Sequence, residues 1–515
     1  YRKEMNDTLS LGHMEKVPIA ELNVPSSKVY YIPHHGVFKE GSTTTKLRIV
    51  LDASCPTSTG VSLNDLLANG PKIQDDLFHI LIRFRLRIVA VVGDVAKMYR
   101  QIALDNAGKD YHRLFWRNTS SEPLEVYRMT RVTYGVKSAG HTSIRSLQVI
   151  AAKFGNAATQ KAMNDFYVDD LLSGDDTINL AGSLIKNITE SLVHGGFELR
   201  KLASSEPSLI NALPEKLREN IEAFEFSDED HLIKTLGLEW QPVSDVFSFK
   251  VCHLDSDPIS SKDVKRGDRA KLKTEIVEEN SKVEGGMFIP FTCPTAELLT
   301  RRKILSDIAK IFDPLGFLSC VVIVLKICMQ EIWKTKLGWD EELPTEITAP
   351  YLEWRDSLTL LRDVKVPRRV IDYTQGVHEL HVFCDASDKA YGAVVYVRYT
   401  FENYVTVKFL TSKARVAPLK HTTIPKLELC AALTGMKLIQ AVLHSLRFLS
   451  IRPTVCAWSD STTVLHWLDN LPGKWQTFVA NRVAQIQEVI PREKWFHVPT
   501  EVNPADLASR GVPVA

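Results

Sequence analysis

The chain has 515 residues, too many for one hydrophobic core of ordinary size, so the length predicts two to four domains. Apolar residues make up 44% and charged residues 24%, as in folded soluble proteins. The formal net charge of +1 excludes an overall basic excess, so a nucleic-acid surface would have to be local. Residues 83–87 and 301–303 are candidate patches, although short charge runs are more often solvated helix faces.

The eight cysteines have no CxxC spacing, which indicates reduced thiols in an intracellular protein. The 15 histidines form no zinc pattern with them. The longest apolar stretch, residues 317–325, ends at Lys326 and is too short to span a bilayer. No secretory signal is visible, and Tyr1 is not a start methionine, so we expect a segment of a longer product.

Two adjacent carboxylates, Asp169 and Asp170, lie between apolar flanks at residues 164–168 and 171–172. This pattern predicts a short β-hairpin with the acids at its tip. A β-branched run over residues 88–92 predicts another strand, which delivers Asp94 at its end. An isolated Asp-Asp pair such as Asp169-Asp170 usually forms only a polar turn. Three carboxylates from two strands, however, can hold the two Mg²⁺ ions that nucleotidyl transfer requires.

Asp94 together with Tyr167-Val168-Asp169-Asp170 resembles the palm motifs of reverse transcriptases, and the Y-V-D-D form is specific to retroelement polymerases. The resemblance implies an RNA-directed DNA polymerase with fingers, palm and thumb. It also implies two Mg²⁺ ions, with Mn²⁺ as a substitute. The expected metal ligands are Asp94, Val95, Asp169 and Asp170, and the three acids are the expected catalytic residues.

The residues upstream of the palm predict short strands at 29–33, 36–39 and 46–52, with a polar hairpin at 40–45. A basic hairpin in this place resembles the polymerase fingers. The resemblance implies that Arg48 grips the triphosphate of the incoming nucleotide, which suits a bidentate guanidinium. Lys39 is the expected assisting lysine. For Lys46, a solvated strand position is equally consistent with the sequence.

Further motifs carry over from the resemblance. Tyr99 is expected as the ring that excludes a 2′-hydroxyl, with a core tyrosine as the alternative. Tyr134 and Gly135 are expected in the nucleotide pocket, before a helix over residues 142–154. Lys201 is the candidate that protonates the departing pyrophosphate. Gly237 is expected to form the sharp turn of the primer-grip hairpin.

Residues 253–285 are rich in Asp, Lys, Glu and Ser and are expected as an exposed insertion. Helical periodicity returns at residues 295–299, with Thr295 as a candidate N-cap. The signature Ile311-Phe312-Asp313-Pro314-Leu315-Gly316 is closely similar to the thumb segment of BEL/Pao-type LTR retrotransposons. It narrows the resemblance to that group.

A second α/β pattern begins near His378. Its acids, Asp385 and Asp460, each follow a predicted strand, whereas Glu428 and Asp506 open predicted helices. Their order resembles the D-E-D-D quartet of ribonuclease H, which implies two Mg²⁺ ions for phosphodiester hydrolysis. Retroviral enzymes carry a histidine on a loop before the last acid. Here that loop shrinks to residues 499–502, and His497 is expected to be structural.

The sequence thus predicts a multidomain α/β chain: an α+β palm polymerase with fingers and thumb, followed by an RNase H-like domain with a mixed sheet. The expected boundaries are an N-terminal extension (1–27), fingers and palm (28–245), insertion (246–290), thumb-like helices (291–345), tether (346–377) and RNase H-like domain (378–515).

The leading hypothesis is a BEL/Pao-type reverse transcriptase with RNase H activity. Its expected partners are an RNA template, a DNA primer or RNA–DNA hybrid, dNTPs, and the peptidase, integrase and Gag-like segments of the same polyprotein, with no membrane. Contacts to the nucleic-acid backbone would be salt-sensitive. The expected location is the cytoplasm, in particles. The alternatives are a catalytically silent, domesticated nucleic-acid-binding protein and an aspartic peptidase; Asp385-Ala386-Ser387 lacks the peptidase D-[ST]-G turn.

Overall fold

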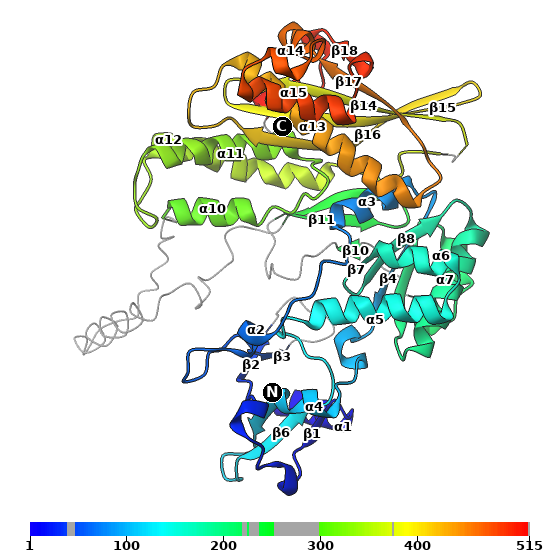
Figure 1. Cartoon of the computed structure of the whole chain (residues 1–515), viewed down its shortest axis with the longest axis vertical. Coiled ribbons are helices and arrows are strands. Elements are labelled where there is room, and N and C mark those ends of the chain that lie inside the picture. The colour runs from blue at the N-terminus through cyan, green and yellow to red at the C-terminus, as the bar shows by residue number, and fades with distance from the viewer. Residues whose placement is uncertain (39–46, 219–223, 226–235, 252–297, 373–374, 513–515) are drawn as a thin grey trace, which may run out of the picture.

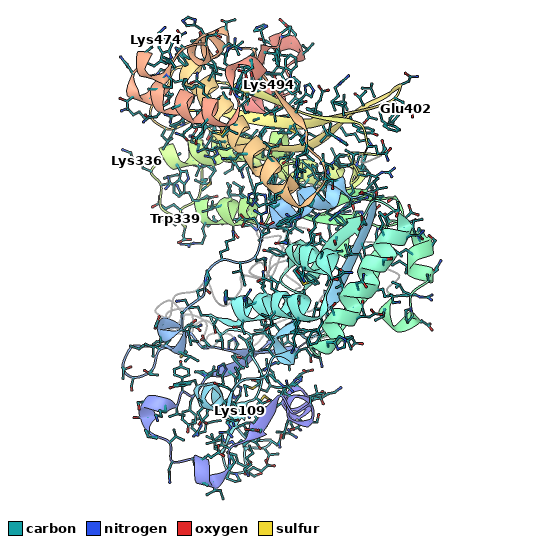
Figure 2. The ribbon with its side chains drawn as sticks, turned by 45° about the vertical axis from the view of Figure 1, so that its right-hand side comes forward. Lys109, Lys336, Trp339, Glu402, Lys474 and Lys494 are labelled. Carbon is teal, nitrogen blue, oxygen red and sulfur yellow. The ribbon has the colours of Figure 1, made fainter. Side chains whose placement is uncertain are left out.

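The computed structural model describes residues 1–38, 47–218, 224–225, 236–251, 298–372 and 375–512. The molecule is elongated, with the N-terminal unit at one end and the C-terminal five-stranded sheet at the other (Figure 1). Lys109 lies at the N-terminal end, and Lys474 and Lys494 lie at the opposite end (Figure 2). The expected insertion over 253–285, Lys39, the 40–45 hairpin and Thr295 all lie outside the described residues.

The N-terminal 27 residues, expected as an extension, contain a helix and a strand that belong to a folded unit. Helix α1 (Arg2–Ser10) is followed by β1 (Met14–Lys16), which pairs with β6 (Glu125–Met129); β6 pairs in turn with β5 (Arg113–Trp116). Met5 and Met14 are buried. A segment this polar has little periodicity of its own, so its structure depends on pairing with β6, more than a hundred residues away.

The fingers hairpin consists of β2 (His34–Phe38) and β3 (Leu47–Leu51), with Val37 opposite Arg48. The strand expected over residues 29–33 is wrong, because that stretch makes a single bridge from Tyr31 to Arg113. Pro33, which has no N–H group to donate, ends it.

The palm sheet has the strand order β7-β8-β4-β9, formed by Phe166–Tyr167, Asp170–Asp175, Val89–Val95 and Leu199–Ser204. Neighbouring residues of β4 pack in different cores because side chains alternate along a strand. Val91 packs with helix α7 (Ile178–His194), whereas Val92 packs with helix α3 (Leu77–Leu86). The expected palm helix is present as α5 (Ala139–Phe154).

A second small sheet has the order β10-β11-β12-β13, formed by Phe224–Glu225, Leu236–Gln241, Val246–Val251 and Val366–Pro367. The expected β11–β12 hairpin is present, but the turn assigned to Gly237 is wrong. Gly237 lies inside β11, opposite Lys250, and the chain reverses at residues 242–245, where Asp245 has a φ of 51°.

Three helices follow: α10 (Arg301–Ala309), α11 (Ser319–Lys334) and α12 (Thr345–Ser357). The observed cap of α10 is Thr300, whose side chain accepts a hydrogen bond from the Lys303 N–H. The stretch expected as a tether from residue 346 begins within α12, which buries Tyr351 and Trp354. Pro344 precedes the helix, where the missing N–H costs no hydrogen bond.

The C-terminal domain has a mixed five-stranded sheet, as predicted, in the order β16-β15-β14-β17-β18. The strands are Tyr404–Val416, Ala390–Phe401, Val377–Ala386, Thr454–Ser459 and Trp495–His497. β14 is antiparallel to β15 and parallel to β17. Helix α13 (Ile424–Ser445) packs on β14 and β15. Residues 424–448 are long and apolar enough for a membrane span, but most of this stretch is buried as a core helix. The remaining helices are α14 (Thr462–Leu468), α15 (Thr477–Val489) and α16 (Asp506–Arg510).

The Ile311–Gly316 signature lies on the edge strand of this sheet. The Leu315 carbonyl accepts hydrogen bonds from the Ser412 N–H at 3.1 Å and from Thr411 Oγ1 at 2.6 Å. Ser412 Oγ donates to the Gly316 carbonyl. The signature therefore covers an edge of β16 that would otherwise present unpaired backbone groups. The segment expected as a thumb is packed against the RNase H-like sheet in this structure.

Gly316→Ala is expected to destabilise the protein by roughly 2 kcal/mol or more, because an L residue is strained at positive φ and has no room here. Gly316 has a φ of 71°, and a Cβ would lie 2.0 Å from the Ser412 carbonyl oxygen. Urea unfolding measures the change. Gly60→Ala is the matched control, since Gly60 has a φ of 81° with nothing within 4 Å. Equal losses in the two variants would show that the contact with β16 is unimportant.

Candidate active sites

The palm acids meet at one end of the palm sheet. Asp94, near the end of β4, lies directly opposite Asp170 at the start of β8. Asp169 lies in the turn between β7 and β8, and its carbonyl accepts a hydrogen bond from the Val95 N–H at 2.9 Å. Val168, with a φ of 54°, supplies the left-handed residue of this turn. The hairpin predicted for residues 166–172 is therefore confirmed, with the acids at its tip.

Charge is concentrated at this tip. Burial raises the pKa of the Asp169 carboxyl, and the negative charge of Asp94 raises it further, whereas Arg200 and Arg48 act in the opposite direction. Arg200 Nε donates to Asp94 Oδ2 at 2.8 Å. The acids thus attract cations, as a metal-binding set would. Sequence reasoning missed Arg200; its place in β9, beside β4, was the available signal.

The fingers and palm residues expected to bind nucleotide differ in their surroundings. Arg48 is exposed on β3 and acts electrostatically on Asp169. Tyr99 is buried in the 3₁₀ turn Met98–Gln101, and its ring meets the exposed ring of Tyr134 edge to face at 4.7 Å. Lys201 follows Arg200 in β9 with a φ of 55°.

Gly135 has a structural reason for being glycine. Its φ is 92°, and a Cβ would lie 2.2 Å from the Leu51 carbonyl oxygen. The Gly135 carbonyl accepts a hydrogen bond from Asn64 Nδ2 at 2.9 Å. The close approach to Leu51 of β3 by itself requires glycine here, and the expected contact of Gly135 with nucleotide stays a prediction.

The second site lies at the C-terminal ends of β14 and β17. Carboxylate oxygens of Asp385, Glu428 and Asp460 lie within 4.8 Å of one another. Asp385 ends β14, Glu428 lies in the second turn of α13, and Asp460 directly follows β17. Glu428 Oε1 accepts from the Ala386 N–H at 3.3 Å. The structure thus brings together three members of the predicted quartet.

The fourth acid, Asp506, begins α16 at the rim. Its charge, together with that of Asp460, raises the pKa of the Asp385 carboxyl, although burial is the largest cause of that increase. Arg510 Nε pairs with Asp506 Oδ1. Ser509, in the same helix, donates to Asp385 Oδ2 and holds that carboxylate. Ser509 was missed because a serine three residues after a helix start carries no signal by itself.

The carboxylate oxygens of this site are incompletely paired. Within the described residues, Glu428 Oε2 and Asp460 Oδ1 are buried without a hydrogen-bond partner. Burial, followed by the charges of Asp385 and Asp460, raises the pKa of Glu428 to about 9. Buried acceptors are normally satisfied. Unpaired oxygens that converge on one point are the donor set a divalent cation takes, so the residues fit Mg²⁺ or Mn²⁺.

The shortened segment before Asp506 is compact. His497 ends β18, where it pairs with Ser459 of β17. A 3₁₀ turn, Thr500–Val502, leads from there to the last acid. His497 therefore lies on a strand and is exposed, and its expected structural role stays a prediction.

Two other groups have metal-like composition, contrary to the expectation of no histidine–cysteine pattern. One joins Glu379, His381 and Cys456. Trp458 Nε1 donates to His381 Nδ1 at 3.1 Å, which places the neutral ring's proton on Nε2, the atom facing the group. The other joins Asp75, His79 and His444, but Asp75 is already paired with Arg83 and Arg447. Neither group offers an open metal site.

Half of the cations in the basic runs 83–87 and 301–303 are buried and hold protein groups, so these runs do not form exposed basic patches. Arg83 pairs with Asp165 at 2.7 Å. Arg85 donates to the carbonyls of Arg368 and Pro367, and Arg301 to that of Ile332. Arg85 and Arg368 thereby connect the palm to the C-terminal region. These guanidinium groups satisfy buried carbonyls and carboxylates, and backbone partners so distant in sequence leave no local pattern.

Known proteins resemble this chain at two levels: one family model matches part of the sequence, and solved structures match nearly the whole fold. Residues 300–461 match the family model described as Pao retrotransposon-like RNaseH-like domain, a range that contains Asp385, Glu428 and Asp460. No curated protein sequence matches the chain.

Three solved structures of the foamy viral protease-reverse transcriptase are similar to 97% of the chain. One, described as dRH in complex with ds DNA, has a TM-score of 0.55 and 15% identity and is covered over 69% of its length. The complex with RNA/DNA hybrid has a TM-score of 0.51 and 13% identity, with 53% covered. The complex with dsDNA has a TM-score of 0.54 and 14% identity, with 82% covered. At this identity the likeness establishes the fold.

Fold and family match together define the class: a chain with a reverse transcriptase-like fold and an RNase H-like domain. Within that class, the match of residues 300–461 identifies the domain as Pao retrotransposon-like, which confirms the resemblance to a Pao-type segment. The predicted domain boundaries remain predictions. The family match begins at residue 300, which agrees with the packing of α10 and α11 beside the RNase H-like sheet.

Proposed function

We propose that this chain is an RNA-directed DNA polymerase with an associated ribonuclease H activity. In the palm, Asp94, Asp169, Asp170 and the Val95 carbonyl hold divalent cations, whose chemistry is to activate the primer 3′-hydroxyl and neutralise the leaving pyrophosphate. The register that sets Asp94 opposite Asp170 supports this assignment. Arg48 binds the triphosphate, Tyr99 and Tyr134 bound the sugar pocket, and Lys201, next to Arg200 in β9, is the proton donor. Lys39 and Gly237 remain proposed contacts to nucleotide and primer.

In the second site, Asp385, Glu428, Asp460 and Asp506 hold two Mg²⁺ ions, or Mn²⁺, which supply a nucleophilic water and stabilise the departing 3′-oxygen of the cleaved RNA. The observation that carries this proposal is the convergence of buried, unpaired oxygens on Glu428 and Asp460. Ser509 orients Asp385. The four carboxylates would thus hold the cations at the scissile phosphate, and Ser509 would keep the Asp385 carboxylate oriented toward them.

The proposed substrates are an RNA template, a DNA primer, their hybrid and dNTPs. The similar structures of the foamy viral protein are complexes with dsDNA or RNA/DNA hybrid, which supports nucleic acid as the partner class. Association with the peptidase, integrase and Gag-like segments of a polyprotein in cytoplasmic particles is proposed from the retrotransposon resemblance.

Hydrolysis of the RNA strand in a preformed hybrid tests the nuclease. We expect cleavage with Mg²⁺ and a loss of at least about 100-fold in Asp460→Asn, because removing a metal ligand costs more than the 10–100-fold typical of outer contacts. Asp469→Asn, an exposed acid paired with Arg492, is the matched control. Hybrid binding without cleavage in the wild type would favour the silent, domesticated binding protein.

A further inference from the structure

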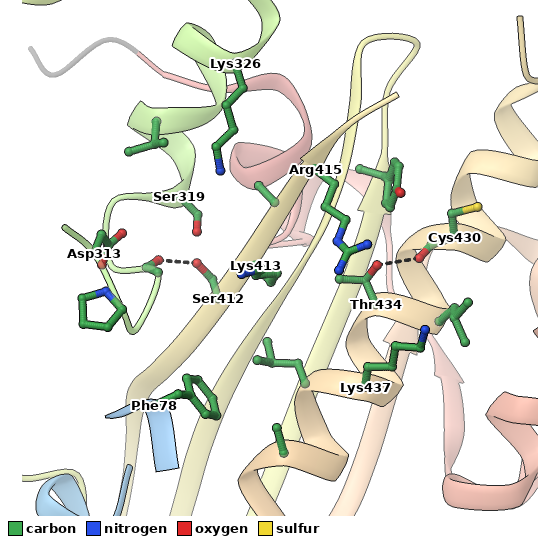
Figure 3. Close-up of a pocket in the computed structure, with 18 of the residues that line it drawn as sticks. Phe78, Asp313, Ser319, Lys326, Ser412, Lys413, Arg415, Cys430, Thr434 and Lys437 are labelled. Atoms are coloured by element: carbon green, nitrogen blue, oxygen red, sulfur yellow. Dashed lines mark hydrogen bonds between the residues drawn. The ribbon is translucent and has the colours of Figure 1, made fainter. Parts of the chain in front are cut away.

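A cavity of about 600 Å³ lies at the edge strand of the RNase H-like sheet, and none of its lining residues belongs to either acid cluster. Its walls come from the Asp313–Gly316 loop, α11, β16 and α13 (Figure 3). Lys326 reaches toward β16 from α11 on one side of the strand, Arg415 extends on its other side, and Lys437 lies on the α13 wall (Figure 3). Lys413 and Arg482 complete the cationic lining.

The cavity's positive charge is not balanced within the described residues. Asp313 is the one carboxylate among those that line it, and its oxygens accept from the N–H groups of Phe317 and Leu318 at 2.9 and 2.8 Å. Lys326, Lys413, Arg415 and Lys437 form no ion pair in the part of the chain that the structure describes. Desolvation lowers the pKa of Lys326, and the charges of Lys413 and Arg415 lower it further. Like charges held together in a concave site favour an anion.

Sheet register places this cavity close to the proposed nuclease site. Asp385 lies opposite Gly392, and Gly392 lies opposite Ala414, which stands between Lys413 and Arg415. Two strand spacings separate these positions, about 10 Å. Ala414 packs against Ile323 on the α11 face, so its neighbours point toward the α13 face, on which Glu428 also lies. A hybrid whose RNA strand lies at the carboxylates could therefore place a phosphate only a few nucleotides away in the cavity.

We propose that this cavity binds a backbone phosphate of the hybrid whose RNA strand lies at the Asp385–Glu428–Asp460 cluster. The inference rests on the proposed function. Arg415 offers a bidentate guanidinium, and the lysines act as point charges on the same group. Such a contact fixes the duplex relative to the carboxylates without reading sequence. Docking of the Ile311–Gly316 signature on β16 builds one wall, so that signature positions the site.

The test measures binding of a fluorescent RNA–DNA hybrid in the full chain carrying Asp460→Asn, so that no cleavage occurs. Lys413→Glu/Arg415→Glu is expected to weaken binding roughly tenfold or more and to reduce the log–log salt slope by about 1 per lost phosphate contact. The control is Lys186→Glu, an exposed lysine on α7. Both substituted cations of β16 are exposed, so the melting temperature should not change.

A single neutral methylphosphonate, moved along each strand, locates the contact. At one position the methylphosphonate should weaken hybrid binding by the Asp460→Asn parent, but not by the parent that also carries Lys413→Glu/Arg415→Glu. Unchanged affinity and slope in the variant, or no coupled position, overturn the inference while leaving the proposed function intact. Loss of pyrophosphate binding alone would assign the cavity to free polyphosphate and also overturn it. A parent that binds no hybrid contradicts the proposed function, and the inference falls with it.

Discussion

Asp169→Asn is expected to abolish DNA synthesis on an RNA template while leaving hydrolysis of a preformed hybrid unchanged. Asp169 lies at the tip of the palm hairpin, where burial and Asp94 raise the pKa of its carboxyl and where its charge would be neutralised by cations. Loss of this ligand should lower primer extension by at least about 100-fold. The nuclease acids lie in another sheet, so their activity should stay within roughly twofold. Gel-based extension and cleavage assays measure both.

Asp176→Asn, a substitution just beyond the end of β8, is the matched control. It changes the same charge without touching the hairpin tip, so extension should persist. If Asp169→Asn extends primers as well as the control does, the palm carboxylates are not the polymerase site. If it loses both activities together with its melting transition, the substitution has unfolded the chain, and Asp94→Asn then repeats the test from β4.

Glu428→Gln is expected to make the metal-free protein more stable while abolishing RNA hydrolysis. The pKa of Glu428 rises from 4.5 to about 9, chiefly through burial and then through Asp385 and Asp460. Between these values the native state retains a proton that the unfolded chain has lost, so stability falls as pH rises through this window. Glutamine removes that penalty. We expect a gain of about 2 kcal/mol at pH 8 without metal.

Metal should reverse the ranking. Mg²⁺ binds the native wild type and should raise its melting temperature, whereas the variant, lacking a ligand oxygen's charge, should respond little. Thermal melts over pH 5 to 9, with and without Mg²⁺, give both results. Glu379→Gln, in the same strand as Asp385 but outside the cluster, is the control. A variant less stable than the wild type at pH 8 without metal would contradict the account of strained, unpaired carboxylates.

Several active-site features could be predicted because their signals are local. Asp94, Asp385 and Asp460 each lie at or just after the end of a largely apolar run, and these runs form the strands β4, β14 and β17. The alternation of strand patterns with the helix that begins at residue 424 was enough to predict the mixed sheet. Catalytic acids at strand ends can therefore be predicted from the sequence.

The rest depends on distant contacts. Arg85 donates to the Arg368 carbonyl, 283 residues away, and a run of arginines gives no hint that its partners are buried backbone groups. The N-terminal 27 residues fold because Met14 pairs with Met129. The signature that contains Gly316 can be recognised in the sequence. Its position on β16, however, depends on how the helical segment packs against the RNase H-like sheet. Arg200 and Ser509 act only where tertiary structure sets them beside an acid.

The most direct test follows both strands of one substrate. A DNA-primed RNA template, labelled differently on each strand, is incubated with the wild-type chain, dNTPs and Mg²⁺. We expect the DNA to lengthen and the RNA behind it to be cut, with Asp169→Asn stopping DNA synthesis and Asp460→Asn stopping only RNA cleavage. Intact hybrid binding with neither change to the strands would contradict two working carboxylate sites and leave a protein that only binds nucleic acid.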